Sequence, residues 1–168
     1  MITVVLPLIS ILMMRFLGLL ASLEMHDKME RVGPLIATGI FYLWLYVNIR
    51  SNSYLPTLYH VFVLGSTISL FVAFFINNFT KISLHTVGAG GLVFAFILLH
   101  QYSYGQFEIY AGSSVFSIST IFIIALIVFI AGLIGASRMY LKAHNKEQLY
   151  LGYLVGILGQ LFAYNIIY

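Results

Sequence analysis

The sequence contains no cysteine and little charge. Charged residues make up 8% of the 168 residues, and hydrophobic residues make up 61%. Soluble domains contain about 25% charged residues, so this composition excludes an ordinary soluble domain. The absence of cysteine excludes disulfides and thiolate metal sites. The chain is therefore predicted to be an integral membrane protein.

Hydrophobic runs of membrane-spanning length account for most of the chain. A transmembrane helix needs roughly 20 apolar residues, which leaves room for about six helices and short loops. We expect an all-α fold, a polytopic bundle of about six transmembrane helices that forms one integral-membrane domain over residues 1–168. A tyrosine-rich loop, Gln101–Ser113, separates the fourth run from the fifth. The runs are Met1–Leu23, Pro34–Ile49, Thr57–Ile76, Leu84–His100, Ser114–Ala136 and Leu149–Tyr168.

Polar residues gather in the loops that follow the first, third and fifth runs. Successive helices cross the membrane in opposite directions, so these three loops emerge on the same side. The opposite side carries Arg50 and Glu108 and little other chemistry. A single polar site on one membrane face is therefore expected. Its candidate residues are Lys28, Arg31, Lys81, Ser83, His85, Arg138 and His144.

The most informative stretch is Gly135–Gly156, between the last two apolar runs. Here a Ser137-Arg138 pair is followed after five residues by His144, and Gln148 comes four residues later. A serine, an arginine and a histidine at this spacing can hold a phosphate beside a nucleophilic imidazole. The stretch resembles the third signature of the type 2 phosphatidic acid phosphatase family, S-R-x5-H-x3-D, followed by a glycine-rich helix. It departs from that signature at Gln148, where the family has aspartate.

Two further pieces of the chain resemble the same family, in family order. Ile82-Ser83-Leu84-His85 matches the second signature, P-S-G-H, at Ser83 and His85. A helix that begins beside His85 would also favour an anion there. The stretch from Lys28 through Arg31 to Pro34 is a compressed version of the first signature, K-x6-R-P. On a helix, Lys28 and Arg31 would share a face and reach one phosphate.

The resemblance implies a specific chemistry. His144 would attack phosphorus and form a phosphohistidine, and His85 would protonate the leaving oxygen. The remaining site residues would bind the phosphate, and they are Ser83, Ser137, Arg138, Lys28 and Arg31. Water would then hydrolyse the intermediate without a metal or other cofactor. The expected substrate is a lipid phosphate or pyrophosphate, among membrane lipids and with no nucleic-acid partner; the oligomeric state stays open.

Gln148 raises the main question about activity. In the family, the aspartate at this position accepts a hydrogen bond from the histidine ring and offsets its positive charge. Gln148 can orient the ring, but its neutral amide cannot offset the charge. Glu147 lies three residues after His144, a neighbouring position on a helix, so we expect it to substitute in part for the missing carboxylate. The enzyme is then expected to be slow but active.

Alternatives remain for the function and the orientation. The second candidate function is that of a catalytically weakened family relative, which binds lipid headgroups or a partner membrane protein. A small transporter is less favoured, because the polar residues cluster at one surface and not at midplane. The positive-inside rule would turn the basic face to the cytoplasm. The resemblance implies a bacterial inner membrane with the site facing the periplasm, and we follow it.

Overall fold

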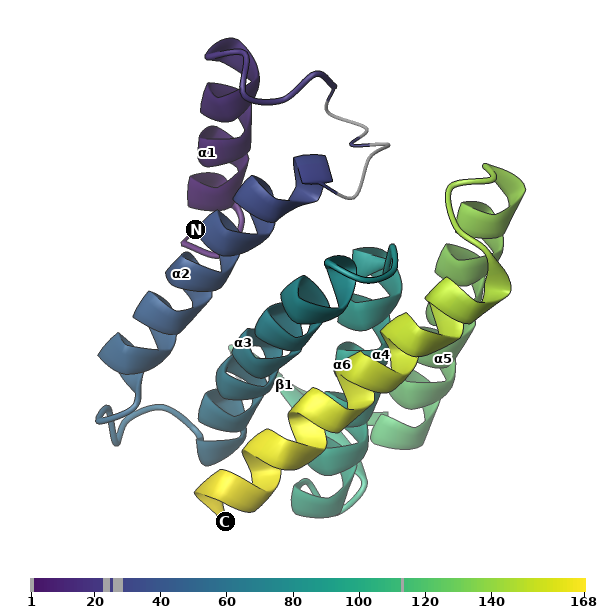
Figure 1. The fold of residues 1–168 in the computed structure, drawn as a ribbon. Coiled ribbons are helices and arrows are strands. Elements are labelled where there is room, and N and C mark those ends of the chain that lie inside the picture. Colours follow the sequence, from purple (N-terminus) through teal and green to yellow (C-terminus); the bar gives the residue numbers. More distant parts are fainter. Residues whose placement is uncertain (1, 23–24, 26–28, 113) are drawn as a thin grey trace.

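In a computed structural model, the structure describes residues 2–22, 25, 29–112 and 114–168 (Figure 1). A short 3-10 helix, η1 (Met29–Arg31), precedes the second helix. Across the described residues, five helices are long and apolar enough to cross a membrane, and a sixth, α1, is shorter. The predicted helical membrane bundle is thereby confirmed. The α-helices are α1 (Val5–Phe16), α2 (Val32–Ile49), α3 (Thr57–Asn77), α4 (Leu84–Tyr102), α5 (Thr120–Tyr140) and α6 (Lys146–Ile167).

Helix α1 is shorter than the predicted run Met1–Leu23. Its 12 residues extend about 18 Å, less than the roughly 30 Å of a bilayer's hydrocarbon core. The helix stops because Gly18 adopts a left-handed conformation, with φ of +74°. The amides of Gly18 and Leu19 then bond back to the carbonyls of Arg15 and Met14, which is the hydrogen-bond pattern of a glycine C-cap.

A β-hairpin replaces part of the expected tyrosine-rich loop. Strand β1 (Gln106–Ala111) pairs antiparallel with β2 (Ser114–Ser119), from Gln106 opposite Ser119 to Ala111 opposite Ser114. The prediction that a helix starts at Ser114 was therefore wrong, and α5 begins at Thr120. The sequence S-V-F-S-I-S contains two β-branched residues and one aromatic residue, which favour a strand.

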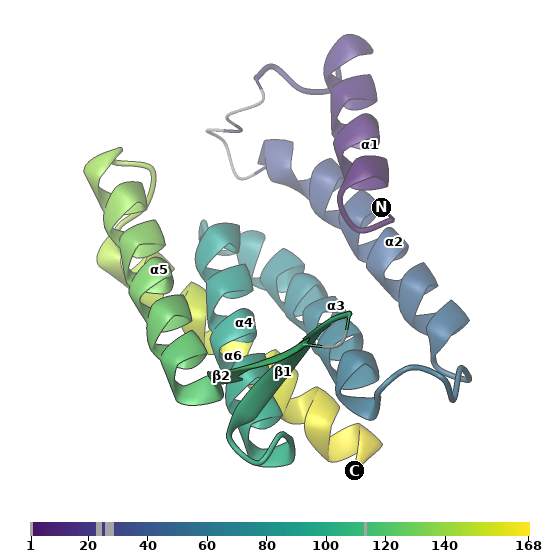
Figure 2. The same cartoon turned by 180° about the vertical axis from the view of Figure 1, so that it is seen from behind.

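Helices α4 and α6 form the centre of the bundle (Figures 1 and 2). Helix α3 packs along α6, and α2 packs along α3, while α5 lies against α4. Glycines allow α4 and α6 to approach closely. A Cβ at Gly90 would clash with the backbone of Tyr153, and one at Gly156 would lie 2.6 Å from the amide nitrogen of Gly91. Gly88 differs, because a Cβ there would meet nothing within 4 Å.

The helix order places the polar loops together. The segments that follow α1, α3 and α5 lie at the same end of the bundle (Figure 1). The segments that follow α2 and α4 begin at the other end, where the C-terminus also lies, and the hairpin after α4 runs back across the bundle (Figure 2). This arrangement was predicted from the alternation of the helices. It brings five helix ends to one surface: the starts of α2, α4 and α6 and the ends of α3 and α5.

Candidate functional site

A tight turn between α5 and α6 positions His144. The amide of Ala143 donates to the carbonyl of Arg138 at 3.0 Å, and the amide of Lys142 donates to Met139 at 2.9 Å. This is a Schellman motif, and its left-handed position is occupied by Lys142, with φ of +52°. The turn reverses the chain within a few residues. Arg138 at the end of α5 and His144 ahead of α6 are thus held in one rigid unit.

His144 is fixed by the capping residues of α6. The side chain of Asn145 accepts a hydrogen bond from the amide of Gln148 at 2.9 Å. In return, Oε1 of Gln148 accepts from the amide of Asn145 at 3.3 Å and lies 3.0 Å from Nδ1 of His144. Because this oxygen can only accept, Nδ1 carries the proton. The other ring nitrogen, Nε2, is therefore left with its lone pair.

The loop before α4 brings Ser83 against α6. The amide of Ser83 donates to the carbonyl of Gln148 at 3.4 Å. Ser83 is fully buried at 0% exposure, yet its hydroxyl has no hydrogen-bond partner among the described residues. The contact depends on Gly152 in α6, because a Cβ there would lie 2.7 Å from the Ser83 carbonyl oxygen and clash with the Thr86 hydroxyl. Two helix N-termini, of α4 and α6, thus meet at one place.

Arg31 joins this cluster from the start of α2. Its Nη1 donates to the carbonyl of Ile82 at 3.1 Å, and its Nε donates to the carbonyl of Met25 at 3.1 Å. Arg31 and Arg138 lie within electrostatic reach of the His85 ring. Two positive charges from different elements, Arg31 before α2 and Arg138 in α5, therefore act on the His85 ring.

Burial and neighbouring charges both act on His144, which is 9% exposed. Burial lowers the pKa of the His144 ring, and the positive charges of Arg31, Lys81 and His85 lower it further, against an opposing hydrogen bond from Gln148. The pKa of Lys81 is also lowered, by burial and by Arg31. The neutral form of the imidazole is thereby favoured. A neutral ring is the form that can act as a nucleophile.

The structure brings together most of the residues predicted for the site. They are Arg31, Ser83, His85, Arg138, His144 and Gln148. Ser137 is exposed and donates its hydroxyl to its own helix, at the carbonyl of Ile134. Glu147 is also exposed, and the His144 ring donates its hydrogen bond to Gln148 instead. Lys28 lies outside the described residues.

One residue of this cluster, Asn145, was not predicted from the sequence. Lys81 was predicted among the polar residues of this face, and its positive charge lowers the pKa of His144. Asn145 holds the Gln148 side chain. The spacing of Asn145 and Gln148 is that of a capping box, which could have been read from the sequence.

The arrangement suits an anion. Nε of Arg138 is buried and has no hydrogen-bond partner among the described residues, as is true of the Ser83 hydroxyl. Helix N-termini attract anions through their free amides and their dipole, and two of them meet here. As for metals, no group of three His, Cys, Asp or Glu side chains within the described part of the chain is placed to hold an ion. The residues present can therefore bind a phosphate and offer it an imidazole nitrogen.

Comparisons of the chain with protein-family models, with curated proteins and with solved structures gave no match.

Proposed function

We propose that the protein is a membrane phosphatase that hydrolyses lipid phosphates or pyrophosphates through a phosphohistidine at His144. The observation that carries this proposal is the state of the His144 ring. Its Nδ1 donates to Gln148 at 3.0 Å, which leaves Nε2 as a nucleophile beside Arg31, Lys81 and His85. The unpartnered Ser83 hydroxyl and Arg138 guanidinium nitrogen supply donors for phosphate oxygens.

In the first step, Nε2 of His144 attacks phosphorus and the bond to the leaving oxygen breaks. His85, in its protonated form, gives a proton to that oxygen. Arg138 and Arg31 neutralise the equatorial oxygens, a task that suits the planar guanidinium fork. In the second step, water attacks the phosphohistidine, His85 takes its proton, and His144 is released with inorganic phosphate.

The position of the cluster supports a lipid substrate. Arg31, His85 and Arg138 lie within a turn or two of the ends of apolar helices. A bilayer places its headgroups at this depth. A phosphate carried on a lipid would therefore reach His144 without leaving the membrane surface.

We further propose that the protein lies in a bacterial inner membrane with this face toward the periplasm. The basic residues of the face would, as simple anchors, favour the cytoplasmic side. As phosphate ligands, Arg31 and Arg138 have another reason for their position. Accessibility of an engineered cysteine at the exposed Lys142 to a membrane-impermeant reagent in intact cells tests this point, since the chain has no cysteine of its own. Labelling only after cell lysis would show that this face lies in the cytoplasm.

One observation favours a second function, a weakened relative that binds lipid headgroups or a partner without turnover. Gln148 offers the His144 ring a neutral acceptor, so the positive charge that develops on the imidazole during attack is not offset. The same cluster would still bind a phosphate. Binding and turnover therefore need to be measured separately.

The test is phosphate release by the purified protein in detergent, with a panel of lipid phosphates and pyrophosphates. We expect release that persists in EDTA, is blocked by vanadate and is lost in His144→Ala. His60→Ala is the matched control, because His60 lies at the other end of the bundle and contacts the carbonyl of Ile49. Release that needs a divalent metal or survives His144→Ala would overturn the mechanism. Saturable binding of lipid phosphate without release would favour the second function.

A further inference from the structure

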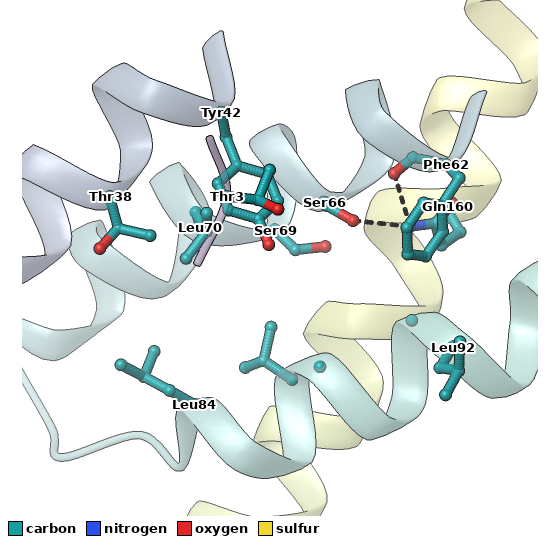
Figure 3. Close-up of a pocket in the computed structure, with 13 residues that line it drawn as sticks. Thr3, Thr38, Tyr42, Phe62, Ser66, Ser69, Leu70, Leu84, Leu92 and Gln160 are labelled. Carbon is teal, nitrogen blue, oxygen red and sulfur yellow. Dashed lines mark hydrogen bonds between the residues drawn. The ribbon is translucent and has the colours of Figure 1, made fainter. Parts of the chain in front are cut away.

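A cavity of about 240 Å³ lies between α2, α3, α4 and α6 (Figure 3). One face of α4 lines it from Leu84, next to Ser83 and His85, to Leu92. Eight residues of helix span about 12 Å. Figure 3 shows Leu84 near one end of the cavity, and Leu92 with Gln160 near the other. The cavity therefore extends from the first residue of α4, which is next in sequence to Ser83 and His85, to Gln160 inside the bundle.

Gln160 of α6 carries a buried polar atom that the fold does not satisfy. The residue is 1% exposed. Its Nε2 donates to the carbonyl of Phe62 at 3.2 Å and to the hydroxyl of Ser66 at 3.5 Å. The Phe62 carbonyl can only accept, which fixes the amide orientation. Oε1 is then left without a hydrogen-bond partner among the described residues.

The depth of Gln160 makes this atom costly. It lies 14 residues after the first residue of α6, about 21 Å along the helix and well within the hydrocarbon region. A polar group there has no bulk water to bond. Polar residues within membrane helices commonly mark a ligand path. Thr38 and Ser69 also line the cavity, but their hydroxyls donate to the carbonyls of Pro34 and Val155.

We propose that this cavity receives the chain of the substrate lipid and that Gln160 selects chains carrying an O–H or N–H donor. The inference rests on the proposed function for the phosphate, which would sit at the Leu84 end of the cavity. The chain would extend along α4 to Gln160, where the donor bonds Oε1. A plain hydrocarbon chain would fill the same space but leave that oxygen unsatisfied. Gln160 is thus a specificity-determining residue.

The experiment compares monophosphate esters of a plain long-chain alcohol with esters whose chain bears one hydroxyl, moved along the chain. We expect kcat/KM to be about tenfold higher for one position of the hydroxyl, as one buried hydrogen bond contributes. Gln160→Met should abolish this preference and leave turnover of a short, water-soluble phosphate ester unchanged. Equal kcat/KM for all esters in the wild type, or a preference that survives Gln160→Met, would overturn the proposal.

A second variant tests the cavity even if Gln160→Met does not fold. Gly88 lines the cavity, and a Cβ there meets nothing within 4 Å, so Gly88→Leu should fold and block the chain. It should reduce kcat/KM for long-chain esters at least tenfold and spare the short ester. Gly132→Leu in α5 is the control, since Gly132 is equally open and does not line this cavity. Equal effects of the two variants would argue against the cavity.

Failure of the proposed function can be separated from failure of this inference. The phosphate-free alcohols, plain and hydroxylated, are added to the protein and the shift in Tm is measured. Suppose that no ester is hydrolysed, but the hydroxylated alcohol raises Tm more than the plain one in the wild type and not in Gln160→Met. The cavity then binds a hydroxylated chain, and only the proposed phosphatase activity fails. If the two alcohols give the same shift in wild type and Gln160→Met, the assignment fails whatever the phosphatase does.

Discussion

The Nδ1 atom of His144 donates a hydrogen bond to Oε1 of Gln148 across 3.0 Å. The same oxygen is held by the amide of Asn145, so the capping box of α6 also sets the tautomer of the histidine. Tautomer control and charge compensation, which one carboxylate could provide together, are here separated. Gln148 supplies the first and not the second.

Restoring a carboxylate should therefore accelerate the reaction. Gln148→Asp keeps an acceptor for Nδ1 and adds a negative charge beside the developing imidazolium. We expect kcat to rise by about tenfold or more. In a serine protease, replacing the aspartate beside the catalytic histidine by asparagine removes both the correct tautomer and the negative charge, and lowers kcat roughly 10⁴-fold. Glu147→Gln is the matched control and should leave kcat unchanged, because Glu147 is exposed. A fall in Glu147→Gln would revive the idea that Glu147 substitutes for the carboxylate.

Arg138 should not be replaceable by lysine. Its buried Nε has no partner among the described residues, and an ammonium cannot present a planar pair of donors to phosphate. We expect Arg138→Lys to reduce kcat/KM by about 10²-fold, the scale of losing one preorganised donor. Arg50→Lys, at the far end of the bundle, should be neutral. Steady-state kinetics with one lipid phosphate measures kcat/KM of both variants. Equal kcat/KM would show that Arg138 does not bind the phosphate.

The acidic limb of the pH profile should lie below the ordinary histidine range. In the proposed mechanism, His144 must be neutral to attack, and burial and the charges of Arg31, Lys81 and His85 lower its pKa. The nucleophile therefore stays active as pH falls, and kcat/KM should decline only below about pH 6.5. Lys81→Met removes one positive charge, so the limb should move to higher pH. A limb that stays in place, or moves down, contradicts this account of His144.

The close contact of α4 and α6 should be sensitive to a single methyl group. A Cβ at Gly152 would lie 2.7 Å from the carbonyl oxygen of Ser83 and would also clash with Thr86. We expect Gly152→Ala to destabilise the protein by about 1–3 kcal/mol and to reduce activity, because the Ser83 loop must move. Gly132→Ala meets no atom within 4 Å and should unfold at the same temperature or higher. Thermal unfolding in detergent measures both; equal Tm values would contradict the packing.

The sequence predicted the helical bundle because long apolar runs admit few other structures in a membrane. Because successive helices run in opposite directions, the sequence also correctly predicted that the segments with Arg31, His85 and His144 lie at one end of the bundle. The length of α1 was missed, since it depends on the left-handed conformation of Gly18. Strand β2 (Ser114–Ser119) was missed because the run was taken as an apolar helix, without weighing its three serines and its β-branched residues.

Within the candidate site, sequence spacing predicted His144 and Arg138 but not the residues that position them. Spacing alone could not distinguish Gln148 from Glu147 as the partner of His144, because both are neighbours on a helix. The difference depends on where α6 begins: Asn145 is its N-cap, which turns Gln148 inward and leaves Glu147 exposed. The cavity that ends at Gln160 needed four helices in place before it existed. No local pattern in the sequence indicates it.

The most direct test of the central claim is to look for phosphate on His144 itself. Protein mixed with a ³²P-labelled lipid phosphate is quenched in alkali, and the labelled residue is located by peptide mapping. We predict an acid-labile, alkali-stable label on the peptide that contains His144, absent in His144→Ala and retained in His60→Ala. Absence of label from wild-type protein that releases phosphate, or label that persists in His144→Ala, would contradict the account.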